Sequence, residues 1–234
     1  MEKKYEFTGE TRKFLGKTLY RIRALVDIGR DIKAGDLGGW IESERNLSQE
    51  DDAWVMGQAT VMDYAEVMDH ARVSGQARIS DHARIFGNAW VSKQARISDY
   101  AEVSGCAWVS DYAWITGHAW ISDFARVMGQ ARVSGVFIRG YAKIIGQARI
   151  YREYDYIVIS PIGSRNDYTT FCHTKDGSII VVCGCFQGNI NEFEAIVKKV
   201  HGDNKHGRAY MAAIQFVKSV INTDTIEDMK KTCL

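Results

Sequence analysis

The chain has 234 residues, with 30 lysines and arginines against 29 aspartates and glutamates, so its formal net charge is +1. This balance excludes a protein that gathers nucleic acid or anionic membrane through its overall charge, although local basic patches are compatible with it. No apolar run approaches the roughly 20 residues that a membrane span needs, and MEKKYEFTGE lacks the apolar core of a signal peptide. Five cysteines without a framework spacing are typical of a reducing compartment. We therefore expect a soluble cytoplasmic protein.

Residues 1–52 are predicted to form an N-terminal cap. The segment KTLYRIRALVDI (residues 17–28) contains a stretch of alternating apolar and polar residues and a short apolar run, and both patterns are typical of β-strands. The following AGDLGGWI places Gly38 and Gly39 in a turn before Trp40. We interpret these three residues as an aromatic plug for the end of a repeat array. The alternative is a ligand-binding loop, because loops often carry binding residues.

Residues 53–151 are built from a repeat of six residues. Alanine opens each repeat from Ala53 to Ala131, and Val or Ile stands two positions later. Alternate residues of a strand point to the same side, so both apolar residues face inward and the residue between them, such as Trp54, faces outward. The fifth position is Gly or Asp except at Lys93, and these are turn residues that tolerate positive φ. The pattern predicts short strands that stack and are joined by tight turns.

The last position of the repeat indicates how many repeats close one coil. Glutamine recurs there at multiples of eighteen residues, and once more after a slip of one residue near GVFIRGYA. We therefore predict three hexads per coil and a triangular cross-section. In that arrangement the amides stack along one edge, where they can form a hydrogen-bonded ladder. The glutamines are Gln58, Gln76, Gln94, Gln130 and Gln147.

The units AxVxGx and AxIxDx, in coils of three hexads, resemble the hexapeptide-repeat proteins over residues 53–150. The resemblance implies a mainly β protein, a left-handed parallel β-helix with a cap at its N-terminal end. It does not specify an activity, because that fold carries acyltransferases, carbonic anhydrases and proteins without a known reaction. The segment GDLGGWIESERNLSQEDDAWVMGQA is similar to the start of a bacterial and phage subgroup that is labelled as transferases without demonstrated chemistry.

Residues 152–234 follow a different pattern and are predicted to form a small α+β domain. DYIVIS (residues 155–160) is typical of a strand, and YTTFCHT and SIIVVCGCF flank Lys175-Asp176-Gly177, which indicates a hairpin turn. Apolar residues at helical spacing predict two helices, over residues 190–202 and 209–221. The apolar residues of the helices are Ile190, Phe193, Ile196, Val197 and Val200 in the first and Tyr210, Ile214, Phe216, Val217 and Val220 in the second.

The resemblance also implies a candidate reaction, acyl transfer, and the sequence can be searched for the residues that this reaction needs. In the resembling enzymes a histidine at a coil edge takes a proton from the acceptor, and acyl-CoA lies between neighbouring subunits of a trimer. The edge histidines here are His70, His82 and His118. No inserted loop interrupts residues 53–136 to build a pocket beside them. We interpret each histidine as a surface turn residue and assign no catalytic residue and no cofactor.

Two further groups in the C-terminal part contain residue types that bind ligands. Four side chains near the predicted hairpin could be counted as metal ligands, but their spacing is not a standard zinc pattern, and cysteine in a strand is more often a small buried apolar group. Two polar loops could hold a phosphate or nucleotide, although ordinary loops explain them better. The metal candidates are Cys172, His173, Cys183 and Cys185, and the phosphate candidates are Ser164, Arg165, Lys205 and Arg208.

Outward-facing tryptophan and arginine residues are the main candidates for an interaction surface. One column recurs in eighteen-residue steps, and a second set of tryptophans falls in three successive hexads, one for each face of a coil. Cation–π stacking within the chain and binding to another protein both account for them. The column contains Trp54, Arg72, Trp90, Trp108 and Arg126, and the ring contains Trp108, Trp114 and Trp120.

These features favour a non-enzymatic interaction or scaffold protein. Its partner would be a second copy of the chain, in a dimer or trimer, or a host protein such as a defence component, as the phage-like resemblance implies. An acyl-CoA-dependent acyltransferase and a nucleotide-binding protein are the alternatives. Neither a membrane nor a nucleic acid is expected as a partner, since the net charge is close to zero.

Overall fold

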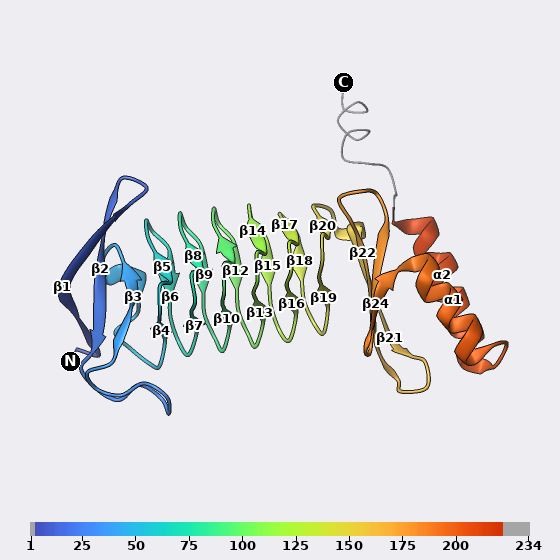
Figure 1. The fold of residues 1–234 in the computed structure, drawn as a ribbon, viewed down its shortest axis with the longest axis horizontal. Helices are drawn as coiled ribbons and strands as arrows, with labels where there is room; N and C mark the ends of the chain where they lie inside the picture. The colour runs from blue at the N-terminus through green and yellow to red at the C-terminus, as the bar shows by residue number, and fades with distance from the viewer. Residues whose placement is uncertain (1–2, 222–234) are drawn as a thin grey trace, which may run out of the picture.

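The structure is a computed structural model that describes residues 3–221, and it forms an elongated rod of three parts (Figure 1). An antiparallel hairpin stands at one end, a parallel β-solenoid makes the body, and a four-stranded sheet covered by two helices stands at the other end. The mainly β class, the parallel solenoid and the C-terminal α+β region predicted from the sequence are confirmed. Residues 222–234 of the predicted C-terminal domain lie outside the described residues.

The N-terminal hairpin extends one sheet of the solenoid. Its two strands are antiparallel, the second pairs with β3, and β3 pairs in parallel with the first coil. Ile22, Ile41 and Leu47 close the end of the apolar interior. Gly38 and Gly39 lie within β3 and not in the predicted turn. Trp40 is buried, but on the outer side of β3 with Leu19 rather than in the interior. The elements are β1 (Tyr5–Phe14), β2 (Lys17–Ala24), β3 (Leu37–Ile41) and the 3-10 helix η1 (Glu44–Asn46).

The solenoid consists of three parallel sheets, and the strands from β4 to β17 pair at steps of eighteen residues, as Trp54 does with Arg72 and Trp114 with Arg132. This confirms three hexads per coil. The first sheet contains β4 (Trp54–Val55), β7 (Arg72–Val73), β10 (Trp90–Val91), β13 (Trp108–Val109), β16 (Arg126–Val127) and β19 (Lys143–Ile144). The second contains β5 (Thr60–Val61), β8 (Arg78–Ile79), β11 (Arg96–Ile97), β14 (Trp114–Thr116), β17 (Arg132–Ser134) and β20 (Arg149–Ile150). The third contains β6 (Glu66–Val67), β9 (Arg84–Ile85), β12 (Glu102–Val103), β15 (Trp120–Ile121) and β18 (Phe137–Ile138).

Backbone hydrogen bonds run along the axis of the rod. The N–H of an outward residue donates to the carbonyl of the alanine one coil further on, as Trp54 does to Ala71 at 3.0 Å and Arg72 to Ala89 at 2.9 Å, and Trp120 donates to Val136 at 3.0 Å in the shortened coil. The alanines and their Val or Ile partners from Ala53 to Val133 are fully buried. Stacking therefore supplies both the apolar interior and the backbone pairing that a single hexad lacks.

The corners explain why the fifth position is Gly or Asp. These residues have positive φ, from +55° at Asp69 to +74° at Gly129, and Lys93 shares this conformation. A side chain at positive φ is unfavourable unless a short polar group forms a local hydrogen bond. The Asp99 carboxylate accepts one from the N–H of Gly117 at 2.8 Å, in the next coil.

One coil is a residue shorter than the others, as the sequence predicted. Trp120 pairs with Phe137 and Arg126 with Lys143, which are steps of seventeen residues. Val136 occupies the place that alanine has in other hexads and is buried. The shorter coil therefore lacks one residue at a corner, and the strands on both sides of it still pair in register.

The predicted glutamine ladder is wrong. The Gln58 amide oxygen accepts hydrogen bonds from Trp40 Nε1 and Arg12 Nη1, both at 3.2 Å, and Gln94 donates to the Tyr112 hydroxyl at 3.4 Å. Within residues 3–221 no hydrogen bond joins two of the five amides. The cap binds the first glutamine, and Tyr112 interrupts the column.

The C-terminal sheet contributes to two cores. Phe171 and Val181 pack with the helices, whereas Cys172 and the partly buried Ile180 pack against the end of the solenoid. Alternation along the strands therefore joins the helical layer and the rod through one sheet. The elements are η2 (Glu153–Asp155), β21 (Tyr156–Ile162), β22 (Asp167–His173), β23 (Ile179–Cys183), β24 (Phe186–Asn189), α1 (Ile190–His201) and α2 (Lys205–Val220).

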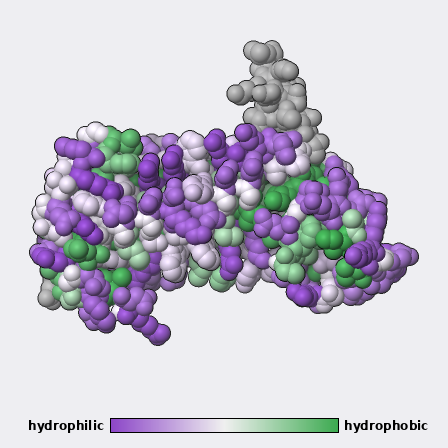
Figure 2. Space-filling view, in the orientation of Figure 1, coloured by the Kyte–Doolittle hydropathy of each residue, from purple (hydrophilic) through white to green (hydrophobic). Residues whose placement is uncertain are grey.

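Helix α2 begins four residues earlier than the sequence predicted. The Asn204 side chain caps it, because its oxygen accepts hydrogen bonds from the N–H groups of His206 (2.9 Å) and Gly207 (3.0 Å). Part of the apolar stripes of both helices is exposed, including Val200 and Phe216. Figure 2 shows hydrophobic surface over this C-terminal part and a mostly hydrophilic solenoid. Neither helix of the described chain has the length and apolarity to cross a membrane.

Trp54 contradicts its predicted exposure, because the cap covers it. Its side chain is 0% exposed, whereas Trp90, in the same column two coils away, is 50% exposed. The Tyr5 ring meets the indole edge-on at 6.3 Å between ring centroids. A Cβ on Gly38 would lie 2.8 Å from its Cζ2 atom, so Gly38 allows β3 to approach this closely.

We expect Trp54→Ala to lower the free energy of unfolding by about 3–5 kcal/mol, because it leaves a large cavity between cap and solenoid. Trp90→Ala is the matched control and should cost less than about 1 kcal/mol, since its indole is half exposed. Urea unfolding followed by circular dichroism measures both. Equal losses in the two variants would contradict this account of the cap.

The hairpin turn between β22 and β23 gives a pH-dependent prediction. Hydrogen bonds from Thr174 and Ser178 lower the pKa of Asp176 from 3.8 to about 2. A carboxyl whose pKa is lower in the folded state stabilises the fold above its unfolded pKa, and this contribution is lost as pH falls from about 4 to 2. Asp176→Asn should therefore lose less thermal stability than the wild type over that interval. Parallel melting curves for the two proteins would refute the assignment.

Candidate interaction surface

The predicted tryptophan column is in register but only partly accessible. Trp54 is buried, and Arg72 is partly buried where its guanidinium donates to the Asp52 carbonyl oxygen; burial lowers the pKa of Arg72. Trp90, Trp108 and Arg126 remain, on β10, β13 and β16, and we name them the tryptophan face. Trp90 and Trp108 lie 6.3 Å apart between ring centroids, and the Arg126 guanidinium lies 5.7 Å from the Trp108 ring. Contacts within the chain therefore order these side chains without burying them.

The ring of three tryptophans lies as predicted, one on each sheet. Trp108, Trp114 and Trp120 belong to β13, β14 and β15 of a single coil. Their exposures are similar, at 39%, 38% and 41%. Each face of this coil therefore presents an indole that is held by its own sheet and open to solvent.

The outward residues of the third sheet include opposite charges that pair with one another. Arg84 lies between two glutamates, at 3.9 Å from Glu66 and 3.1 Å from Glu102. Further along, the Trp120 and Phe137 rings are 5.8 Å apart. We name these five outward residues the charge-paired face. Opposite charges in neighbouring strands stabilise such a sheet.

The second sheet places like charges beside one another. Its outward residues pair in register from β8 to β20, and arginine meets arginine twice, at Arg78 with Arg96 and at Arg132 with Arg149. Among residues 3–221 none of these four arginines forms an ion pair with a carboxylate, unlike Arg84 on the neighbouring sheet. We name the row the arginine face; it contains Arg78, Arg96, Trp114, Arg132 and Arg149.

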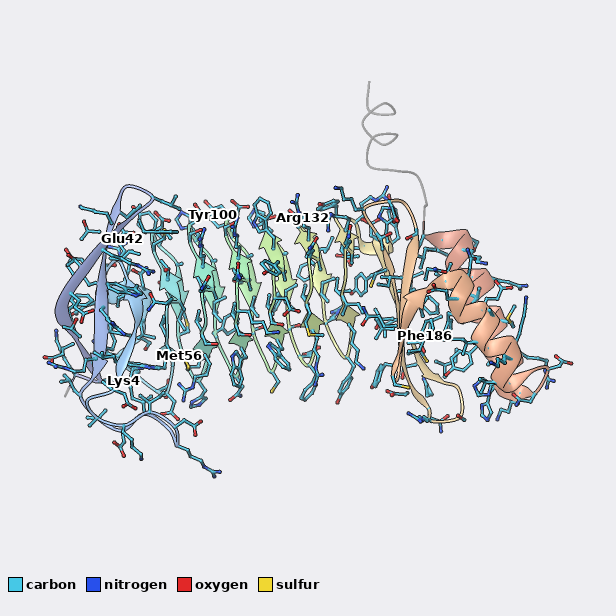
Figure 3. The ribbon with its side chains drawn as sticks, viewed as in Figure 1. Lys4, Glu42, Met56, Tyr100, Arg132 and Phe186 are labelled. Atoms are coloured by element: carbon cyan, nitrogen blue, oxygen red, sulfur yellow. The ribbon has the colours of Figure 1, made fainter. Side chains whose placement is uncertain are left out.

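A groove of about 300 Å³ runs along this face and its adjoining corner. The Arg149 side chain is mostly buried in it, and its Nη1 donates to the carbonyls of Gln130 (2.8 Å), Gln147 (3.1 Å) and Ala148 (2.9 Å). Burial lowers the pKa of Arg149. The groove is lined by Gln94, Arg96, Tyr112, Trp114, Gln130, Arg132 and Arg149. Figure 3 places Arg132 near the upper edge of the rod, between Tyr100 and the C-terminal sheet.

The sequence analysis named Trp114, Gln94 and Gln130 of this groove, but none of its arginines. The signal was present, because steps of eighteen residues from Arg78 reach Arg96, Trp114 and Arg132, and a step of seventeen reaches Arg149. No acidic residue occupies this column. The row is visible in the sequence when the outward residues are compared at steps of one coil.

The edge histidines are turn residues, and two of them form a stack. His82 lies between Tyr64 and Tyr100, with ring centroids 4.9 and 4.8 Å apart, and His118 stacks on Tyr100 at 5.0 Å. His70, at another corner, has its Nδ1 3.7 Å from an Asp52 carboxylate oxygen. The two tyrosine rings cover both faces of the His82 imidazole. This stacking holds the side chains at this corner in place.

The structure does not gather the four metal candidates. Cys172 pairs with Ile180 and Cys183 with Thr169, so the register separates the two cysteines along the hairpin. Cys172 is buried against the solenoid, which raises the pKa of its thiol, while His173 points to the other side of β22 and Cys185 is exposed. Residues 3–221 contain no group of three side chains placed to hold a metal ion.

The two predicted phosphate loops meet only through a tyrosine. A Cβ on Gly163, beside Ser164 and Arg165, would lie 1.9 Å from the Tyr210 hydroxyl. Arg208 instead donates to the Asp203 carbonyl of its own helix start. Lys205 is the first residue of α2. No hydrogen bond or ion pair of the described chain joins the two loops, and their phosphate binding stays a prediction.

Compared with known proteins, the chain matches no protein-family profile and no functionally curated sequence. The candidate surface is therefore assigned from the geometry of the faces.

Replacing Arg96 by threonine should stabilise the protein by a few tenths of a kcal/mol, up to about 1, because Arg78 loses a like-charged neighbour. Threonine is suitable because Thr60 stands in the same column. The gain should disappear in 1 M NaCl, where the screening length is about 3 Å.

Arg84→Thr is the control, and it should destabilise because Arg84 is paired with Glu66 and Glu102. Urea unfolding at low and high salt measures both changes. A loss of stability in Arg96→Thr equal to that in Arg84→Thr would show that the arginine row carries no excess repulsion.

Proposed function

We propose that this protein is a non-enzymatic scaffold that binds protein surfaces through outward side chains of its solenoid. The observation that carries the proposal is the ring of Trp108, Trp114 and Trp120, which presents an exposed indole on each face of one coil. Tryptophan and arginine supply a large share of the binding energy at protein interfaces. Contiguous exposed apolar area marks interaction sites, and two of these indoles lie beside a further exposed aromatic ring, Trp108 beside Trp90 and Trp120 beside Phe137.

The rigidity of the coils supports the same function. Strands on both sides pair with Trp108, through Trp90 and Arg126, so the backbone beneath the indole is fixed. Side chains that are already ordered lose little conformational entropy on association, and more of their contact energy is available for affinity.

The proposed partner is a second copy of the chain, in a dimer or trimer, or a protein of a phage host, as the sequence resemblance implies. We also propose that the solenoid is left-handed and belongs with the hexapeptide-repeat proteins, which is supported by its hexads of Ala-x-Val/Ile. A reducing cytoplasm is the proposed location. The free, exposed thiols of Cys106 and Cys185 are compatible with it.

The combined variant Trp108→Ala and Trp120→Ala tests the scaffold function and leaves the arginine groove intact. We expect it to fold normally and to weaken association at least tenfold, the effect of removing an interface hot spot. Light scattering measures the mass of the purified protein, and affinity purification from its native cells identifies co-purifying proteins. Phe216→Ala, an exposed aromatic on α2, is the control. If the double variant keeps both its mass and its partners, the proposal is wrong.

A further inference from the structure

The groove on the arginine face concentrates positive charge that the protein leaves unbalanced. Arg96, Arg132 and Arg149 line it, and no carboxylate is among its lining residues. The protein can balance such a row, since Arg84 on the next sheet has a glutamate on either side. Three cations in a confined groove raise the local potential, and an anion bound there would relieve their repulsion.

The cations are held in place before any ligand arrives. Arg149 is only 7% exposed, and three backbone carbonyls fix its Nη1. The Arg132 guanidinium lies 5.0 Å from the centre of the Trp114 ring. The Arg132 guanidinium is suited to phosphate, because it can donate two parallel hydrogen bonds to its oxygens, whereas Arg149 contributes mainly its fixed positive charge.

The remaining walls of the groove suit a flat heterocycle. Tyr112 and Trp114 are both exposed aromatic side chains that border it, and aromatic stacking on a base contributes about 1–3 kcal/mol. Gln94 and Gln130 flank Tyr112, and each amide can both donate and accept hydrogen bonds. The volume of about 300 Å³ is at the lower end of the range of small-molecule sites.

We propose that this groove binds a nucleotide, with the phosphate on the arginines and the ring between Tyr112 and Trp114. A nucleic-acid strand fits less well, because Asp81 and Asp99 stand at the corner that ends the same face and would repel a continuous polyanion. An acidic peptide would use the arginines but not the aromatic and amide walls. The groove shares Trp114 with the ring proposed for protein binding, but nucleotide binding does not depend on that function.

Isothermal titration calorimetry with the mono- and triphosphates of adenosine, guanosine, cytidine and uridine tests the site. At least one nucleotide should bind saturably, and its nucleoside and inorganic phosphate should each bind at least tenfold more weakly, since each makes only part of the contacts. Arg132→Ala and Trp114→Ala should each weaken binding about tenfold or more, by loss of a charge-assisted hydrogen bond and of stacking.

Arg84→Ala and Phe137→Ala are the matched controls, because they remove an arginine and an exposed aromatic side chain from the charge-paired face. Both should retain wild-type affinity, and melting curves without ligand verify that all four variants are folded. Three results would overturn the proposal: no nucleotide binds at millimolar concentration, the controls weaken binding as much as the groove variants, or a decathymidine or polyglutamate binds more tightly than every nucleotide.

Discussion

The pairing of each strand with the strand one coil away determines the rest of this structure. Neighbouring strands are about 4.8 Å apart, so the residues at one position of successive coils become direct neighbours, as Trp90, Trp108 and Arg126 are. The same pairing satisfies the backbone and buries the alanine and valine or isoleucine columns. A side chain on this rod is therefore understood through its column rather than through its neighbours in sequence.

On each face the outward side chains of successive coils are direct neighbours, and the three faces differ in how these side chains interact. The tryptophan face stacks indoles and a guanidinium, and the charge-paired face alternates glutamate and arginine. The arginine face places like charges on neighbouring strands at Arg132 and Arg149. The Trp114 ring and backbone carbonyls hold these side chains, but within residues 3–221 no carboxylate pairs with them, so a ligand is the physical reason that we infer for the row.

The two ends protect the rod from open strand edges in different ways. At the N-terminal end the hairpin continues a sheet through β3 and covers Trp54. At the C-terminal end a separate sheet lies across the last coils, with Cys172 directed toward the solenoid and Phe171 toward the helices. Both caps contribute apolar side chains to the interior and block edge-to-edge pairing.

The sequence by itself determined the architecture, because the hexad is a local rule: alternation sets which side chain faces inward, and Gly or Asp sets the corner. Three hexads per coil and the shortened coil near Val136 followed from the same periodicity. Tertiary structure decided which outward residues are accessible. Trp54 and Trp90 are equivalent in the repeat, yet one is buried and the other exposed, because contacts from β1 and β3 reach only the first coils. The same holds for Arg149 at the last coil, whose Nη1 also donates to the Gln130 carbonyl of the preceding coil. The periodicity specifies the environment of each repeated position. Burial at the two ends of the solenoid depends instead on contacts with residues that are distant in sequence and that the repeat does not predict.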